Sequence, residues 1–283
     1  FDDYVTRQGE IVTGTVQRIS NETIFVNLGR TEGILSANEQ VPGERYKVND
    51  RLKVFIMDVK KTTKGPQVFL SRSHPGLVKR LFELEVPEIE DGTVEIKGIA
   101  REAGSRTKMA VYTQFEDVDP VGACVGTRGT RVQAIVDELH GEKIDIITWS
   151  ENPEELIASV LSPAKVEEVI VDESGEKSAT VIVPDYQLSL AIGKEGQNVR
   201  LAAKVSGWKI DIKSHSQYKA AEEEYGDEGF VEYDEDAEAE ISEAEMDVEA
   251  ETSEALEEAE TSEAPEEAAE AAADEASEEQ EAE

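Results

Sequence analysis

The sequence predicts a multidomain α+β protein made of a small closed β-barrel, a helix-and-strand unit present twice, and a disordered acidic tail. Three observations predict this class. Residues 9–72 are rich in short β-branched segments, residues 74–214 repeat a pattern at a spacing of 67, and residues 221–283 hold 30 Asp and Glu with no Lys or Arg. The net charge of −36 belongs mainly to that tail, because residues 1–220 carry 34 acids against 28 bases. The acidic average therefore does not exclude nucleic acid as a partner of the folded part.

The barrel is predicted over residues 9–73, with residues 1–8 as the end of an upstream linker. Its strands are expected in segments rich in Val, Ile, Thr and Phe and separated by Gly, Asn and Pro, at residues 10–19, 23–29, 52–59 and 67–71. Five or so short strands in so few residues favour a closed barrel, because closure removes the exposed edges of a narrow sheet.

A duplication follows the barrel. Residues 121–136 align with residues 188–203, and this alignment pairs Gly126 with Gly193 and Gly129 with Gly196. The tetrapeptide Lys-Ile-Asp-Ile then occurs at residues 143–146 and again at residues 209–212. A repeat of this length indicates a duplicated domain. We call residues 74–150 the first repeat and residues 151–215 the second repeat.

Each repeat is expected to run helix, strand, strand, helix, helix, strand. In the second repeat Asn152 is a plausible helix cap and Pro153 suits the first helical position. The other expected elements are helices at 76–84, 152–161 and up to residues 125 and 139, and strands at 92–100, 107–113, 166–172 and 178–184.

Residues 216–283 are expected to be a disordered acidic tail, because Glu, Asp, Ala, Ser and Thr cannot bury enough apolar surface to offset ordering entropy. Two roles stay open for it. A tethered polyanion would compete with RNA at low salt, or the tail would simply keep the chain soluble.

A Gly-x-x-Gly sequence joins the last two helices of each repeat: Gly126-Thr127-Arg128-Gly129 in the first and Gly193-Lys194-Glu195-Gly196 in the second. We call these the first and second GxxG loops. Their amides should lie at a helix N-terminus, which favours an anion, and glycine allows a phosphate backbone to approach closely. Residues 121–136 contain two Arg and no acid. The alternative is a tight helix-helix turn, but two such loops in register within a duplicated unit favour phosphate binding.

At these residues a resemblance is clear. Both repeats resemble KH domains of the prokaryotic (type II) topology, whose GxxG loop clamps single-stranded RNA or DNA backbone. The preceding barrel resembles an S1-type OB-fold through residues 14–16, 25–29, 32–35 and 68–71. An S1 barrel followed by two KH domains is similar to the NusA family of transcription termination and antitermination proteins, and this similarity covers residues 9–214.

The resemblance implies a cytoplasmic, monomeric RNA-binding elongation factor that acts in transcription pausing, termination and antitermination. Its implied partners are the single-stranded nascent transcript, RNA polymerase, and other elongation and antitermination factors, with polymerase bound mainly by a domain upstream of the barrel that this sequence lacks. The residues expected to contact RNA are Gly126, Thr127, Arg128, Gly129, Arg131, Gly193, Lys194, Glu195, Gly196, Asn198, Arg200, Lys204 and Phe25.

Two departures from the family pattern affect this site. S1 barrels often carry a second aromatic residue near Phe25 and a His in the following loop, but Ser20-Asn21-Glu22 and Ile34-Leu35-Ser36 stand at these places. The barrel is therefore expected to bind RNA weakly, and Phe25 would otherwise be a core residue. Glu195 is an acid inside the second loop, so the first loop is expected to be the stronger clamp.

Other functions find little support in the sequence. It contains no nucleophile-elbow, Walker or HExxH motif, and Cys124 on an apolar helix suits a structural thiol. No enzyme activity, cofactor, metal site or membrane span is expected. A ribosome-associated or mRNA-metabolism RNA-binding protein without a polymerase role remains the alternative.

Overall fold

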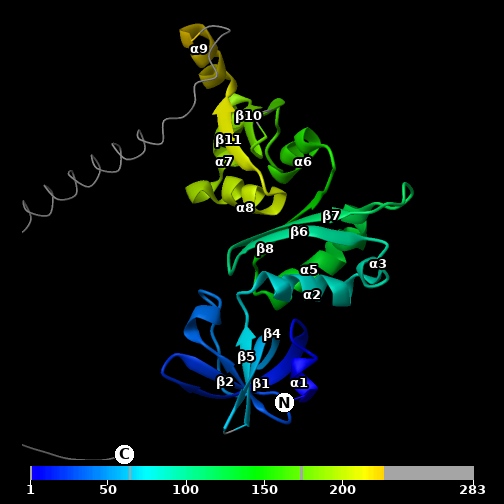
Figure 1. Cartoon of the computed structure of the whole chain (residues 1–283), viewed down its shortest axis with the longest axis vertical. Coiled ribbons are helices and arrows are strands. Elements are labelled where there is room, and N and C mark those ends of the chain that lie inside the picture. The colour runs from blue at the N-terminus through cyan, green and yellow to red at the C-terminus, as the bar shows by residue number, and fades with distance from the viewer. Residues whose placement is uncertain (1, 64, 173–174, 226–283) are drawn as a thin grey trace, which may run out of the picture. The chain divides into compact units, whose positions relative to one another are not determined.

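Three folded parts succeed one another along the residues that the structure describes, a β-barrel and two α+β repeats (Figure 1). The structure is a computed structural model, and it describes residues 2–63, 65–172 and 175–225. The predicted multidomain α+β class is confirmed for this part of the chain. Residues 226–283, most of the expected tail, lie outside the described residues.

The barrel is formed by five strands in the closed order β1-β2-β3-β5-β4. Alternate side chains of these strands fill its core, including Val16, Ile24, Leu35 and Val68. The short helix α1 (Asp2–Val5) and the turn η1 (Ala37–Glu39) were not predicted. The strands are β1 (Ile11–Ser20), β2 (Thr23–Asn27), β3 (Glu32–Leu35), β4 (Arg51–Thr62) and β5 (Gly65–Ser71).

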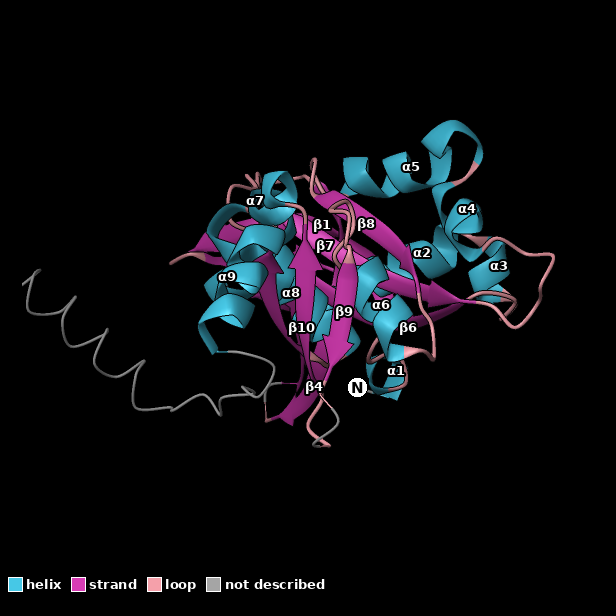
Figure 2. Ribbon diagram, turned by 90° about the horizontal axis from the view of Figure 1, so that it is seen from above, coloured by secondary structure: helices cyan, strands magenta, loops and turns pink. Residues whose placement is uncertain are grey.

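The first repeat packs its helices on a three-stranded sheet of order β6-β7-β8 (Figure 2). Strands β6 and β7 are antiparallel, whereas β7 and β8 are parallel. Pro75 begins α2, and the His74 imidazole accepts a hydrogen bond from the Gly76 amide as its cap. The elements are α2 (Pro75–Glu85), α3 (Pro87–Glu90), β6 (Glu95–Glu102), β7 (Arg106–Tyr112), α4 (Pro120–Val125), η2 (Thr127–Gly129), α5 (Thr130–Glu138) and β8 (Lys143–Thr148).

The second repeat has the same topology, with the sheet order β9-β10-β11 and β10 parallel to β11. As predicted, Asn152 caps its first helix by accepting from the Glu154 amide, and Pro153 is the first helical residue. The elements are α6 (Pro153–Val160), β9 (Glu168–Val171), β10 (Ser178–Val183), η3 (Asp185–Gln187), α7 (Leu188–Ile192), η4 (Lys194–Gly196), α8 (Gln197–Ser206) and β11 (Lys209–Ser214).

A further helix, α9 (His215–Tyr225), corrects the expectation that disorder begins at residue 216. Ser214 and Gln217 form a capping box: the Ser214 amide donates to the Gln217 side chain, and the Gln217 amide donates to Ser214 Oγ. Asp185 also accepts from both the amide and the hydroxyl of Ser216. These contacts order the start of a segment whose composition alone predicts disorder.

One hydrophobic cluster reaches across both repeats, although the first repeat also has a core of its own. Ala100, Ala110 and Ile147 from the sheet of the first repeat belong to the same buried cluster as Leu161 and Val205 of the second. Polar contacts cross the same boundary. The buried Lys108 ammonium donates to the Ser162 carbonyl at 2.7 Å, and burial lowers the pKa of this lysine. The repeats are therefore joined by packing as well as by the chain.

None of the helices in the described part of the chain is both long and apolar enough to span a membrane.

Candidate nucleic-acid interface

The two GxxG loops have the same backbone conformation. The first glycine of each is near φ 75–79° and ψ 172–173°, and the last glycine is left-handed at φ 77° in Gly129 and 67° in Gly196. The third residue is left-handed too, although it is not glycine: φ is 55° for Arg128 and 52° for Glu195. Two segments that agree at every turn-forming residue hold one specific shape rather than two unrelated turns.

Each loop runs directly into a helix. Helix α5 begins after Gly129, and α8 begins after Gly196. Neither glycine offers a side-chain cap, so the first amides of these helices receive no side-chain acceptor from the cap position. The amides of the last glycine and of the first helical residue donate to loop carbonyls instead: Gly129 to Gly126 and Thr130 to Thr127, and Gly196 to Gly193 and Gln197 to Lys194. The helix dipole still favours an anion beside each turn. The loops therefore have the local electrostatics that a phosphate requires.

The first glycine of each loop is required by close packing. A Cβ atom on Gly126 would lie 2.7 Å from Arg131 Cγ, and one on Gly193 would lie 2.8 Å from the Asn198 backbone nitrogen. Both distances are shorter than real Cβ contacts. The first glycine therefore serves the packing of the loop against the following helix.

The last glycine of each loop is instead open. The nearest atom to a Cβ on Gly129 would be Val132 Cγ1 at 4.0 Å, and the nearest to a Cβ on Gly196 would be 3.9 Å away. A side chain here meets only the strain of a left-handed backbone. This is the side of the loop that is free for a phosphate to approach.

Arg131 and Asn198 were expected to contact RNA, and in the structure both form contacts within the protein. Arg131 Nη1 donates to the Ala123 carbonyl at 2.6 Å and pairs with Glu88 at 2.9 Å. Asn198 is 1% exposed, and its Nδ2 donates to the carbonyls of Leu161 and Ala191. Asn198 is therefore covered, whereas the Arg131 side chain stays 28% exposed, and both pack against the first glycine of their loop.

The other expected residues of the loops lie at the surface. Thr127, Arg128 and Lys204 are exposed. In the second loop Lys194 and Glu195 are 90% and 81% exposed, and their charged groups lie 3.8 Å apart. Because Glu195 screens Lys194 while Arg128 has no ion pair with any described residue, the charge at the first loop favours phosphate more strongly.

Arg200, which was expected to contact RNA, is exposed but also forms contacts within the protein. Its Nε donates to Glu102 of the first repeat at 2.6 Å, and its Nη1 donates to the Glu195 carbonyl at 3.1 Å. The hydrogen bond from Arg200 holds the pKa of Glu102 below its ordinary value. Sequence inspection missed Glu102, because 98 residues separate it from Arg200.

Cys124 precedes the first loop and is fully buried. Burial raises the pKa of its thiol to about 12, so the reactive thiolate is not populated at neutral pH. Among the described residues, no group of three or more His, Cys, Asp or Glu side chains is arranged to hold a metal ion.

On the barrel, Phe25 belongs to a row of apolar side chains across three neighbouring strands. Phe25 pairs with Ile34, and Ile34 pairs with Phe69. All three are partly exposed, whereas the residues before and after each of the two phenylalanines are buried in the core. Phe25 therefore points away from the core.

Cationic side chains flank this row at both ends. Arg18 lies over the Phe25 ring at 3.4 Å, and Lys60 lies 5.1 Å from the centre of the Phe69 ring. Aromatic rings beside cations suit stacked bases and their phosphates. The alternation in Val68-Phe69-Leu70 is the signal that identifies Phe69, because period-two spacing places it on the opposite face from its buried neighbours.

A buried ionic network joins the barrel to the first repeat. The Arg72 side chain is 1% exposed and forms a bidentate pair with Glu44, which is 3% exposed. Arg72 also donates to the Lys53 carbonyl at 2.8 Å and to both the side chain and the carbonyl of Glu138. Barrel strand β4, the barrel loop that carries Glu44, and helix α5 are thus connected by one guanidinium.

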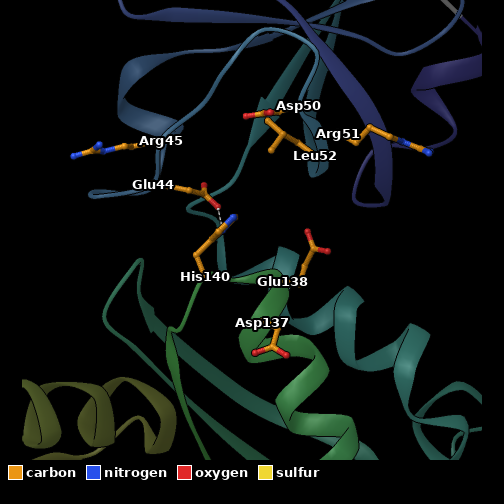
Figure 3. A pocket seen from close by; sticks show the side chains of 8 residues that line it. All are labelled: Glu44, Arg45, Asp50, Arg51, Leu52, Asp137, Glu138 and His140. Atoms are coloured by element: carbon orange, nitrogen blue, oxygen red, sulfur yellow. Dashed lines mark ion pairs between the residues drawn. The ribbon is translucent and has the colours of Figure 1, made fainter.

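Next to this network lies a polar cavity of about 360 Å³ (Figure 3). Figure 3 shows Glu44 of the barrel pointing toward His140 of the first repeat, with which it forms an ion pair when the imidazole is protonated. Burial raises the pKa of Glu44, but Arg72, with Tyr46 and His140, outweighs that effect and lowers the pKa overall. The sequence carries no pattern that identifies this network.

Comparison with known proteins agrees with this architecture part by part. Residues 6–71 match the S1 RNA binding domain, residues 72–149 the NusA-like first KH domain, and residues 153–220 the NusA-like second KH domain. The barrel, the duplicated unit and the paired GxxG loops define an S1–KH–KH protein. The S1–KH–KH part of this chain belongs to the NusA family.

Proteins similar to this chain over its S1–KH–KH part are named NusA. Over 216 residues the chain is 63% identical to the transcription termination/antitermination protein NusA of Bacillus subtilis (strain 168), covering 76% of this chain and 58% of that protein. It is 48% identical over 221 residues to the NusA of Mycobacterium tuberculosis (strain ATCC 25618 / H37Rv), covering 75% of this chain and 64% of that protein. This chain thus spans about three fifths of the length of these relatives.

A solved structure, the crystal structure of APE1850, resembles 48% of the chain at 24% identity with a TM-score of 0.37, which is too low to carry an argument.

Proposed function

We propose that this chain is the RNA-binding part of a transcription elongation factor, which binds single-stranded nascent RNA and takes part in pausing, termination and antitermination. One observation supports the RNA-binding step above all others: the two GxxG loops share one backbone geometry and leave the last glycine open. The names of the relatives support the role in transcription.

In this proposal a phosphate approaches each loop over its last glycine, where the positive end of the following helix dipole and the exposed Arg128 or Lys194 attract it. The barrel contributes stacking through Phe25. The protein works by binding, as a monomer in the cytoplasm, with no cofactor and no catalytic step. RNA polymerase and other elongation and antitermination factors are its protein partners, and polymerase contact in the longer relatives is expected to involve more than this chain.

Substitution at the open glycines tests the clamp. Gly129→Asp and Gly196→Asp add a carboxylate where the phosphate approaches but meet no packed atom. The double variant is expected to lose RNA affinity by at least about tenfold while it stays folded, and the remaining affinity should fall less steeply with salt. Fluorescence anisotropy with a labelled single-stranded RNA measures both quantities.

The matched controls are Gly92→Asp and Gly175→Asp. Both glycines have a positive φ, lie in turns outside the two loops, and have no atom within 4 Å of an added Cβ. They introduce the same charge and the same backbone strain elsewhere. If the loop double variant binds RNA as tightly as these controls do, the clamp is wrong.

The alternative is a ribosome-associated or mRNA-metabolism protein with no polymerase role. The chain, fused downstream of the N-terminal part of a relative, would be recovered with RNA polymerase according to our proposal. Recovery with ribosomes and without polymerase would support the alternative.

A further inference from the structure

The turn between β6 and β7 of the first repeat reaches the second GxxG loop. Glu102 at this turn accepts hydrogen bonds from Arg200 Nε at 2.6 Å and from Gln197 Nε2 at 2.7 Å. The Gln197 amide group also donates to Ser105 Oγ at 2.8 Å. Gln197 and Arg200 lie in the first four residues of α8, directly after Gly196. The start of the helix that follows the second loop is thus fastened to the first repeat.

Arg200 carries this attachment into the loop itself. While Nε is held by Glu102, Nη1 donates to the carbonyl of Glu195 at 3.1 Å. Glu195 adopts a left-handed φ of 52°, which is strained for a residue other than glycine. The guanidinium offsets this strain by supplying a donor to the strained peptide. Arg200 therefore bridges the Glu102 carboxylate and the loop backbone.

The Glu102 contact fixes one end of a long side chain that would otherwise sample many rotamers. The Arg200 side chain is 47% exposed and the Glu102 side chain is 25% exposed, so little else constrains the arginine. A hydrogen bond at Nε holds the planar guanidinium in one orientation. Less conformational entropy is then lost when its remaining N–H groups form hydrogen bonds. Preorganisation of this kind raises affinity for a ligand without any new contact to it.

The first loop has a different arrangement. Gln133 stands 67 residues before Arg200 at the equivalent position of α5, and its amide donates to Asp137 Oδ1 at 2.8 Å within the same helix. The side chain at this position therefore ties the first loop's helix only to itself. At this position, therefore, only the second loop is held by a side chain of the other repeat.

We propose that Glu102 of the first repeat is a positioning residue for the second GxxG loop: it holds Arg200, and through Arg200 the loop backbone, in the geometry that a phosphate of single-stranded RNA meets. This inference rests on the proposed RNA-binding function. It predicts that the second loop reaches its full affinity only while the first repeat supplies this carboxylate.

Glu102 could also have the opposite effect and weaken RNA binding. A carboxylate beside Arg200 also neutralises one positive charge near the loop, and in that role Glu102 would act as an internal substitute for phosphate. Its removal would then tighten RNA binding. The two roles predict changes of opposite sign, so a single affinity measurement separates them.

The experiment isolates each loop in the whole chain. Glu102→Ala is made in a Gly129→Asp background, where binding reports the second loop, and in a Gly196→Asp background, where it reports the first. The probe is a fluorescently labelled single-stranded RNA of mixed sequence, about a dozen nucleotides long, which exceeds the four that one loop clamps. Glu116→Ala is the matched control, because it also removes one acid from the first repeat, at an exposed position that has no ion pair with a described residue.

In the Gly129→Asp background, Glu102→Ala is expected to weaken binding about fivefold to tenfold, which is the size of effect that the net contribution of one ordinary hydrogen bond implies. Glu102→Gln keeps an acceptor for Arg200 Nε and should recover most of that loss, which a purely electrostatic effect of the carboxylate would not explain. In the Gly196→Asp background the same substitution should change affinity less than about twofold.

Unchanged or tighter binding by Glu102→Ala in the Gly129→Asp background overturns the proposal, as does an equal loss through both loops. Failure of the underlying function has a different signature. In that case the Gly129→Asp and Gly196→Asp double variant itself binds RNA like the unsubstituted chain, whatever residue stands at position 102.

Discussion

Arg131 of the first repeat and Asn198 of the second occupy the same position and perform the same structural task. Each lies five residues after the first glycine of its loop, packs against that glycine, and donates to a carbonyl of the preceding helix, Ala123 at 2.6 Å and Ala191 at 2.9 Å. The duplicated units have kept the contact while changing the side chain. This relationship separates the residues that shape the loops from those that face a ligand.

The two glycines of one loop should respond differently to alanine. Gly193→Ala brings Cβ to 2.8 Å from a backbone atom and adds left-handed strain, so it is expected to lower the free energy of unfolding by about 3 kcal/mol. Gly196→Ala adds only the strain, about 1 kcal/mol. Urea unfolding of both variants measures the difference. Equal losses would show that close packing does not determine the first glycine.

Asn198→Ala is expected to destabilise the second repeat by about 1–3 kcal/mol, because it removes two buried hydrogen bonds, to the carbonyls of Ala191 and Leu161, although Leu161 keeps the Ala164 amide as a donor. The exposed Gln133→Ala in the first repeat should change stability by less than about 0.5 kcal/mol. Thermal unfolding of both variants provides the comparison. A neutral Asn198→Ala would contradict the structural role assigned to this side chain.

Arg72→Met should strongly destabilise the junction between the barrel and the first repeat. It leaves the Glu44 carboxylate buried without its main partner, at an expected cost of about 3–5 kcal/mol. The double variant Arg72→Met with Glu44→Gln should be more stable than Arg72→Met alone, because no charge is then left buried. Urea unfolding of the single and double variants measures this coupling, and strict additivity of the two effects would refute it.

The same network predicts a loss of stability in acid. Because the pKa of Glu44 in the folded chain lies below its ordinary value of 4.5, its contribution is present above about pH 4.5 and disappears as the pH falls through the lower folded pKa. The free energy of unfolding should therefore decrease below that pH. Glu44→Gln should flatten this part of the profile, measured by urea unfolding at successive pH values, and an unchanged slope would exclude Glu44 as the cause.

Phe69→Ala should weaken the RNA affinity that remains in the Gly129→Asp and Gly196→Asp double variant, as should Phe25→Ala. Loss of one stacked base corresponds to about 1–3 kcal/mol, which is roughly fivefold or more in the dissociation constant. Ile19→Ala, an exposed apolar residue of β1, serves as the control. If Phe25→Ala weakens RNA binding and Phe69→Ala does not, the RNA contacts Phe25 on strand β2 but not Phe69 on strand β5.

The sequence predicted the elements and the duplication because these depend on neighbours along the chain. Segments rich in Val, Ile, Thr and Phe located β4 and β5, and the shared glycine frame located both loops before any contact was visible. The capping box formed by Ser214 and Gln217 was also readable, but the acidic composition that follows it led to the expectation of disorder from residue 216. A local capping signal outweighed average composition over the next ten residues.

The roles of individual side chains could not be predicted as well from the sequence. Arg131, Asn198 and Arg200 look alike in sequence, as polar residues after a GxxG loop, and only their partners distinguish them. Those partners lie 43, 37 and 98 residues away in Glu88, Leu161 and Glu102. No local pattern specifies contacts at such separations. The Arg72 network escaped prediction for the same reason.

The hydrophobic cluster that includes residues of both repeats has a consequence for how the duplicated units come apart. A repeat boundary in sequence is here not a boundary in folding, since cutting the chain near residue 150 would bare an apolar surface on each fragment. The pair should therefore melt as one cooperative block, and native-state hydrogen exchange should report a common opening free energy for the sheets of both repeats.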